Sequence, residues 1–245
     1  MNIKLDEGFL FGLGAFETVA VYDGCPIFLE RHLERLARGL EFLGISRRVT
    51  EEEVYRCLRG QSLPSSGVLK IVVSERNTLF LPRENPYKTE DYEKGFTVDF
   101  ARIRRNETSR FVFHKTLNYG ECISERREAA ARGLNEAVFL NCRGEICEGT
   151  ASNIFFVRNG QIVTPDISSG LLPGVMRGHL LERYDIREER LHGAEISRFD
   201  ECFLTNSLMG VMPVLKFGSR LFETRETADR LGEDYQREYC LPGQA

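Results

Sequence analysis

The amino-acid sequence predicts an α+β protein with two domains, residues 1–104 and residues 105–245. Strand-like runs of β-branched and aromatic residues alternate with amphipathic helical patterns in both parts of the chain. A polar stretch, "RIRRNETSR", lies between two strand-like runs, so we expect it to connect the domains. A chain of 245 residues is also long enough to bury the cores of two medium-sized domains.

A hairpin and a helix open the first domain. The runs "FETVAVY" and "PIFLE" flank Asp23 and Gly24, a pair that favours the tight turn between two antiparallel strands. Leucines then recur at alternating spacings of four and three residues from Leu29 to Leu43, which predicts an amphipathic helix. Gly44 is placed to end that helix.

A second helix and two further strands complete the predicted first domain. The stretch "TEEEVYRCLRG" is expected to be helical, because Thr50 and Glu53 have the spacing of a capping box. Strands are expected over 67–75 and 96–103. The polar, proline-bearing stretch 81–95 between them is expected to be a surface loop.

The second domain is expected to open with a strand, "RFVFHKT", followed by a helix that Gly133 ends. Strands and turns alternate from "EAVFLN" to "IVTP", and a helix is expected to begin near Val175. The run "ECFLTNSLMGVMPVLKF" is expected to be mostly strand, and the last helix to run from about Thr224 to Tyr239.

Composition excludes several classes of function. The 37 acidic and 33 basic residues are interspersed and give a net charge of -4, which argues against nucleic acid as the main partner. Seven irregularly spaced cysteines form no zinc set, so reduced thiols in a cytoplasmic protein are expected. The polar N-terminus "MNIKLDEG", and the lack of an apolar run of about 18 residues, predict neither a signal peptide nor a membrane span.

Lys115 is the first candidate for chemistry. It shares one face of the predicted strand with Phe111 and Phe113. If that face is covered, burial disfavours the charged amine, and a neutral amine is what imine formation or proton transfer needs. The alternative is a lysine that buries its stem and extends its charge into solvent.

Three further positions carry weaker signals. Arg35 borders the leucine stripe, where it could bind an anion or simply cover the stripe. The loop "GLLPGVMR" leads into a helix whose first N–H groups could bind phosphate, with Gly174 permitting close approach, or it could be an ordinary loop. Glu148, at a strand end, could pair with a protonated ring nitrogen or stay exposed. Together these are the parts that a pyridoxal-phosphate enzyme needs.

Six segments in order give the chain a more specific resemblance: "DEGFLFGLGAFETV", "FLERHLERL", "KTLNY", "EAVFLNCRGEICEGTASNIFFV", "TPDISSGLLPGVMR" and "TNSLMGVMPV". They resemble the class IV, or fold-type IV, pyridoxal-phosphate enzymes, which include branched-chain and D-amino acid aminotransferases and aminodeoxychorismate lyases. The similarity runs from about Asp6 to Val214. It implies two α/β-type domains with pyridoxal 5′-phosphate between them, and a homodimer.

The resemblance also assigns roles by position. Lys115 matches the lysine that binds the cofactor covalently, Arg35 the arginine that binds its phosphate, and Glu148 the carboxylate that pairs with the pyridine nitrogen. The other implied cofactor contacts are the backbone N–H groups of Val175 and Met176, the Ser207 hydroxyl, and Tyr119 near the ring hydroxyl.

Within the family, the sequence is most similar to the lyases. Met176 stands where the aminotransferases usually carry threonine, and "NSLMGVMPV" and "GVLKIVVS" have the lyase pattern. The implied reaction converts 4-amino-4-deoxychorismate into 4-aminobenzoate and pyruvate in folate biosynthesis. Phe16, Glu17 and Thr18 would line the substrate side, with Arg76 as a carboxylate partner.

Two alternatives remain open at this point. A branched-chain or D-amino acid aminotransferase would share all the cofactor residues, and a non-catalytic binding protein could share the fold. Intact Lys115, Glu148 and Arg35 argue against the second alternative. The chain departs from the family pattern in two places: "FGLG" replaces the common "FGDG", and few residues precede Asp6.

Overall fold

The computed structural model describes residues 3–60 and 64–240, which fold into two compact units. Unit 1 combines the chain up to Pro86 with the segment His114–Gly120, and unit 2 combines Tyr87–Phe113 with the chain from Glu121 onward. This division differs from the expected boundary between residues 104 and 105. Strand β5 (Phe96–Arg105) pairs with strands of unit 2, so it belongs there and not to the first domain.

Unit 1 contains one antiparallel sheet in the order β2-β1-β3-β4. Asp23 and Gly24 have φ values of 47° and 80°, which confirms the tight turn predicted between the first two strands. The strands of this sheet are β1 (Gly14–Tyr22), β2 (Cys25–Pro26), β3 (Ser66–Ser74) and β4 (Thr78–Glu84).

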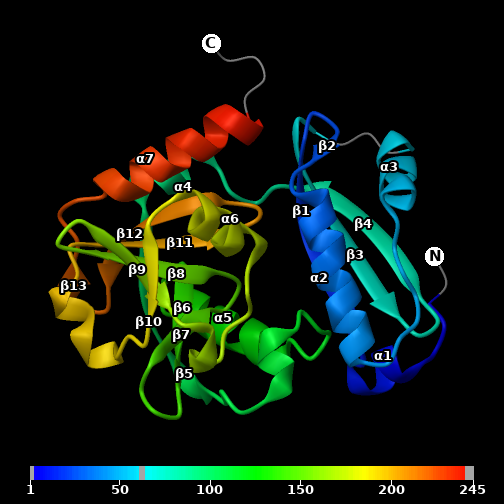
Figure 1. The fold of residues 1–245 in the computed structure, drawn as a ribbon, viewed down its shortest axis with the longest axis horizontal. Coiled ribbons are helices and arrows are strands. Elements are labelled where there is room, and N and C mark those ends of the chain that lie inside the picture. Colours follow the sequence, from blue (N-terminus) through cyan, green and yellow to red (C-terminus); the bar gives the residue numbers. More distant parts are fainter. Residues whose placement is uncertain (1–2, 61–63, 241–245) are drawn as a thin grey trace. The chain divides into compact units, whose positions relative to one another are not determined.

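Three helices accompany this sheet: α1 (Glu7–Phe11), α2 (Leu29–Phe42) and α3 (Glu51–Arg59). Helix α2 covers one face of the sheet (Figure 1). Its leucine stripe forms a core there with alternate residues of β1 and β3. Thr50 and Glu53 form the predicted capping box at the start of α3, and Gly44 has the left-handed φ of 72° expected after α2.

The stretch 81–95 lies at the surface, as expected, but the prediction that all of it is a loop was wrong. Strand β4 continues to Glu84, and a short helix, α4 (Thr89–Lys94), follows. Pro82 made this stretch resemble a loop, but β4 is the edge strand of its sheet. An edge strand tolerates a residue without an N–H group, because one side of its backbone has no partner strand.

Unit 2 contains a nine-stranded mixed sheet in the order β10-β9-β8-β11-β12-β5-β6-β7, with β13 paired to β12. Parallel pairing joins β5 to β6 and to β12, whereas β8, β11 and β12 pair antiparallel. The strands after β5 are β6 (Glu136–Asn141), β7 (Ile146–Gly149), β8 (Asn153–Arg158), β9 (Gln161–Pro165), β10 (Ile186–Glu189), β11 (Glu201–Asn206), β12 (Gly210–Phe217) and β13 (Arg220–Leu221).

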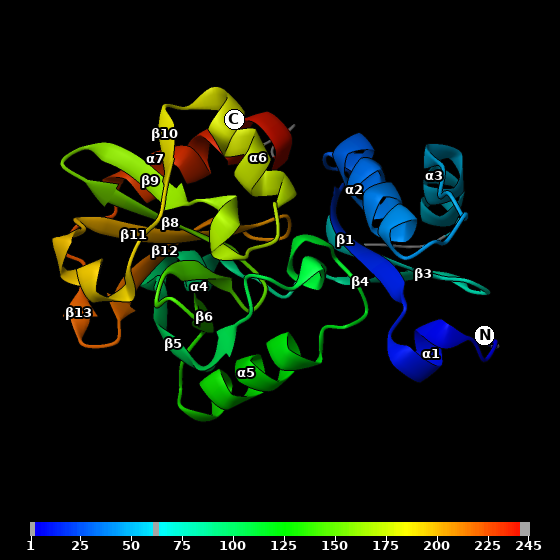
Figure 2. The same cartoon turned by 60° about the horizontal axis from the view of Figure 1, so that its bottom comes forward.

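The longer helices of unit 2 are α5 (Gly120–Ala131), α6 (Val175–Arg183) and α7 (Glu226–Tyr235). Figure 2 shows α6 and α7 on one side of strands β11 and β12, and α5 on the other. The core includes two stacked aromatic pairs, Phe155 with Phe203 and Phe156 with Phe199. Short 3₁₀ turns occupy Arg110–Phe113, Ile167–Ser169 and Gly193–Arg198, and a π-helical turn occupies Gln236–Cys240.

The strand predicted over "RFVFHKT" was also wrong. Arg110–Phe113 forms a 3₁₀ turn, and Phe111 is 38% exposed. Only the end of this stretch is extended, where Thr116 forms an isolated antiparallel bridge with Ala15 of β1. The alternation of apolar residues therefore did not reflect a covered strand face.

The described residues bear on the predictions of reduced cysteines, of no zinc site and of no membrane span. Six cysteines there are free, in keeping with the expectation of reduced thiols. No group of side chains in residues 3–60 and 64–240 has the composition of a metal site. Across the same residues, every helix is too short or too polar to cross a bilayer.

Candidate active site

Lys115 is held against the open edge of strand β1 in unit 1. The N–H of Phe16 donates to the Lys115 carbonyl at 2.9 Å, and the N–H of Leu117 donates to Gly14 at 2.8 Å. The Lys115 amine lies 4.6 Å from the centre of the Phe16 ring and 5.2 Å from that of Tyr119. The structure therefore brings together three of the residues that the resemblance implied: Lys115, Tyr119 and Phe16.

A buried ionic cluster joins β1 to α2 on the other face of the sheet. Arg35 donates from Nε and Nη2 to the two carboxylate oxygens of Glu17, each at 2.7 Å. Nδ1 of His32 lies 2.6 Å from the same carboxylate, and both Glu17 and His32 have no exposed surface. This corrects the expectation that Glu17 meets substrate, because neighbouring strand residues point to opposite faces and Glu17 faces α2.

The groups of this cluster shift one another's pKa values. Burial raises the pKa of Glu17, but the charges of Arg35 and His32 outweigh that and hold it far below its ordinary value. Burial lowers the pKa of His32, although the Glu17 carboxylate opposes this effect. Sequence reasoning named Arg35 but missed its partners. The three-residue spacing of His32 and Arg35 on one helix face was the available signal.

Glu148 occupies strand β7 in unit 2 and is almost fully buried. Its carboxylate accepts from Arg105 Nη2 at 2.5 Å and from the Leu172 N–H at 3.0 Å. Burial lowers the Arg105 pKa, but the charge of Glu148 more than offsets this and the pKa stands above its ordinary value. The Arg105 guanidinium also lies 4.5 Å from the centre of the Phe139 ring. The sequence placed Arg105 in a connector, so its role was missed.

The start of helix α6 in unit 2 has the features of an anion site. Gly174 is its N-cap and supplies no side-chain cap. Within the residues that the structure describes, no protein group accepts a hydrogen bond from the N–H groups of Val175 or Met176. A Cβ at Gly174 would lie 2.0 Å from Asn153 Oδ1, so a larger residue would have to displace the Asn153 side chain. Such N–H groups suit a phosphate.

The remaining predicted residues are more dispersed. Ser207 lies in the turn between β11 and β12, next to Asn206, which accepts from the N–H groups of Leu208 and Met209 at 2.9 Å each. Thr18 is half-buried in the middle of β1. Arg76 is exposed in the turn after β3, where its N–H donates to Asp6 at 3.0 Å.

Taken unit by unit, these groups have the chemistry that pyridoxal phosphate requires. Unit 1 supplies an amine on Lys115 beside the aromatic ring of Tyr119. Unit 2 supplies a carboxylate on Glu148, held by a guanidinium, and uncapped N–H groups at the start of α6. The residues present therefore fit this cofactor.

Comparison with known proteins places the chain among enzymes of this kind. The model of the class IV amino-transferase family matches residues 14–217. An aminodeoxychorismate lyase of Bacillus subtilis is 28% identical over 233 residues, covering 86% of this chain and 80% of the relative. A candidate branched-chain-amino-acid aminotransferase of Methanocaldococcus jannaschii is also 28% identical, over 247 residues, covering 91% of this chain and 85% of the relative.

The similar solved structures also include both lyases and branched-chain aminotransferases. The 4-amino-4-deoxychorismate lyase of Pseudomonas aeruginosa superposes with a TM-score of 0.82 and 27% identity, covering 98% of this chain and 97% of the other. A branched-chain aminotransferase of Thermoproteus uzoniensis superposes with a TM-score of 0.83 and 23% identity, covering 94% and 86%. The second likeness concerns the fold alone.

Proposed function

The chain belongs to the class IV aminotransferase family, whose members use pyridoxal 5′-phosphate, and we propose that it is a 4-amino-4-deoxychorismate lyase. The reaction forms 4-aminobenzoate and pyruvate, as in folate biosynthesis. By the same resemblance, we propose that the active protein is a homodimer.

Each chain residue has a defined task in this proposal. Lys115 would hold the cofactor covalently, and its amine would take the proton from the ring carbon that bears the substrate amine. The enolpyruvyl group would then leave as enolpyruvate, which takes up a proton to become pyruvate, and the ring would become aromatic. Bound pyridoxal phosphate supplies the electron sink for this proton removal.

The other residues position the cofactor. Glu148 would pair with the pyridine nitrogen, and Arg105 supports it as an ionised carboxylate. The N–H groups of Val175 and Met176 would bind the phosphate, with Arg35 and the hydroxyl of Ser207 as further ligands. Tyr119 would lie near the ring hydroxyl. These contacts would fix the position of the cofactor relative to the substrate.

Met176 is the observation that favours the lyase over an aminotransferase. Its side chain is 1% exposed and apolar, so it offers the phosphate a backbone N–H but no hydroxyl. The family's aminotransferases usually carry a threonine there. The aminotransferase remains the competing function, because relatives of both kinds are equally similar to the chain.

A paired assay on cofactor-loaded protein tests the proposal. One arm offers enzymatically generated 4-amino-4-deoxychorismate and follows 4-aminobenzoate. The other arm offers L- and D-amino acids with 2-oxoglutarate or pyruvate and follows keto-acid exchange. Rapid 4-aminobenzoate release with slow exchange supports the lyase. The reverse result would identify an aminotransferase and show that Met176 does not discriminate the two activities.

A further inference from the structure

The face of the unit 1 sheet opposite α2 carries two cations. Residues of β1, β3 and β4 alternate between the two faces, and the set that faces α2 forms the apolar core. On the opposite face, Thr18 lies directly across from Lys70, and Val68 lies directly across from Arg83. Lys70 and Arg83 are therefore diagonal neighbours on one face.

Lys70 and Lys115 share a contact with the same aromatic ring. The Lys70 amine lies 4.6 Å from the centre of the Phe16 ring, and the Lys115 amine lies at the same distance from it. Phe16 is 6% exposed, so the ring is fixed by its surroundings. The lysine proposed to bind the cofactor and the cation on β3 therefore both lie next to the Phe16 ring.

No acidic side chain in residues 3–60 and 64–240 forms an ion pair with Lys70 or Arg83. Burial lowers the pKa of Lys70, and the positive charge of Arg83 lowers it further. Two neighbouring cations, one of them half-buried, are unfavourable without a counter-charge. A bound anion would relieve both the desolvation and the repulsion.

We infer that Lys70 and Arg83 form a carboxylate-binding site for a ring substrate that carries two carboxylates. This inference rests on the proposed lyase function and names the residues that recognise its substrate. Thr18, beside Lys70, would add a hydroxyl donor. Arg76 lies in the turn beyond β3, outside the pleated face that holds the pair, so Lys70 and Arg83 replace it as the carboxylate partners.

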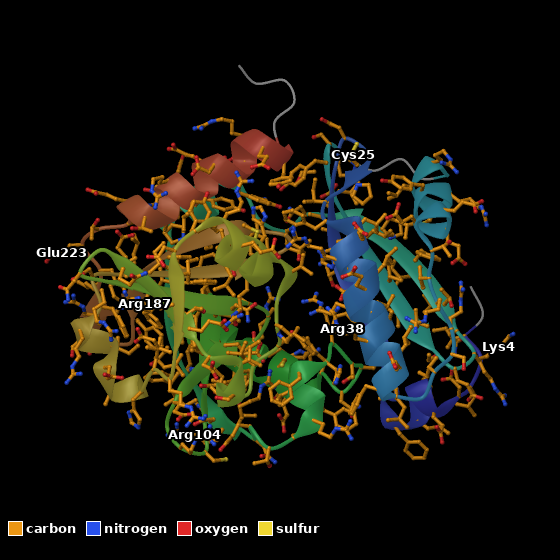
Figure 3. The ribbon with its side chains drawn as sticks, viewed as in Figure 1. Lys4, Cys25, Arg38, Arg104, Arg187 and Glu223 are labelled. Atoms are coloured by element: carbon orange, nitrogen blue, oxygen red, sulfur yellow. The ribbon has the colours of Figure 1, made fainter. Side chains whose placement is uncertain are left out.

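The first test compares kinetics of variants of the holoenzyme. Lys70→Met should raise KM for 4-amino-4-deoxychorismate by about 10- to 100-fold, because one charge-assisted hydrogen bond is lost. The turnover number should change much less, since the contact is made in both ground and transition states. Lys70→Arg should restore most of the affinity. Arg38→Met is the matched control, because Arg38 is an exposed cation on α2 (Figure 3).

The second test does not depend on which reaction the enzyme catalyses. Acetic anhydride labels amines, and mass spectrometry reports the labelling of Lys70 and of exposed Lys4 separately. Isophthalate, a ring dicarboxylate, should slow the labelling of Lys70 but not of Lys4, whereas neutral isophthalamide should protect neither.

The two tests separate the possible failures. If the paired assay identifies an aminotransferase while isophthalate still protects Lys70, the lyase function is rejected and the carboxylate site is retained. Equal labelling with and without isophthalate, or an unchanged KM in Lys70→Met, would overturn the site.

Discussion

The guanidinium of Arg35 and the carboxylate of Glu17 form two parallel hydrogen bonds of 2.7 Å within the buried interface between α2 and β1. This pairing fixes the side chain of the predicted phosphate ligand before any ligand arrives. It also gives a negative charge to a place where the sequence suggested a substrate contact. Arg35 therefore acts in the fold of unit 1 as well as in the proposed binding of phosphate.

Replacing Glu17 should destabilise the protein strongly. Glu17→Gln leaves the Arg35 guanidinium buried without its counter-charge, at a cost of about 3–5 kcal/mol in the free energy of unfolding. Urea unfolding measures the change. Glu52→Gln is the control, because Glu52 pairs with Arg56 on the exposed face of α3 and should cost less than about 1 kcal/mol. Equal losses in the two variants would contradict the structural role of Glu17.

Lys115→Ala should abolish the near-visible absorbance of the bound cofactor. Borohydride reduction of the wild-type protein with pyridoxal phosphate should attach the cofactor to the peptide that contains Lys115, as mass spectrometry can show. Lys4→Ala, at an exposed position labelled in Figure 3, should leave both signals unchanged. A cofactor spectrum that survives in Lys115→Ala would remove Lys115 from its proposed role.

Arg105→Met should weaken the protein and disturb Glu148. The variant leaves Glu148 buried without its cation, which favours protonation of the carboxyl and costs about 3–5 kcal/mol of stability. The pH at which the absorbance of the bound cofactor changes should then shift. Arg104→Met, at the exposed neighbouring position, is the matched control (Figure 3). A shift of the same size in Arg104→Met would exclude a specific effect on Glu148.

Alanine substitutions at two glycines of the α6 region should have different effects, one on cofactor binding and one on stability. A Cβ at Gly174 would meet Asn153 Oδ1 at 2.0 Å, so Gly174→Ala should displace the start of α6 and weaken cofactor binding at least tenfold. A Cβ at Gly178 would meet nothing within 4 Å, so Gly178→Ala should add up to about 1 kcal/mol of stability. Titration with pyridoxal phosphate and urea unfolding measure the two effects. Unchanged cofactor affinity in Gly174→Ala would argue against a phosphate site there.

The side-chain carboxylate of Asp6 should add to the free energy of unfolding at neutral pH, and acid should remove this contribution. Burial raises its pKa, but hydrogen bonds from the Ser74 hydroxyl and from backbone N–H groups outweigh this and lower the pKa to about 2. Because the folded pKa lies below the unfolded one, the stabilisation is present above about pH 4 and is lost as pH falls toward the folded value.

Comparison of wild type with Asp6→Asn isolates this contribution. The variant should be less stable by about 1–3 kcal/mol at neutral pH, and the gap should close near pH 2. Unfolding by urea across the acid range gives the result. A gap that stays constant with pH would show that the charge of Asp6 is not the stabilising feature.

The helices and hairpins of the fold were predictable because their signals are local. Leucine spacing defined α2, the capping box at Thr50 defined α3, and Asp23 with Gly24 defined the first turn. The errors arose where tertiary pairing overrides local pattern. An edge strand accommodated Pro82, and the apolar alternation around Phe113 folded into a 3₁₀ turn.

The candidate site was predictable in its residue types but not in its supporting contacts. The resemblance named Lys115, Arg35 and Glu148, and the structure placed Tyr119 and Phe16 beside Lys115. The resemblance could not reveal that Glu17 turns inward to Arg35, or that Arg105 supports Glu148. Both contacts join segments far apart in the sequence, so no spacing rule connects them.

The return of residues His114–Gly120 to unit 1 means that no single cut divides the chain into two complete folding units. A fragment that ends at Pro86 lacks the residues that pair with Ala15 and Phe16 at the edge of β1. Recombination that exchanged only the N-terminal stretch would therefore separate a sheet from part of its own edge. The proposed catalytic lysine lies in this returning segment, downstream of the sheet that holds it.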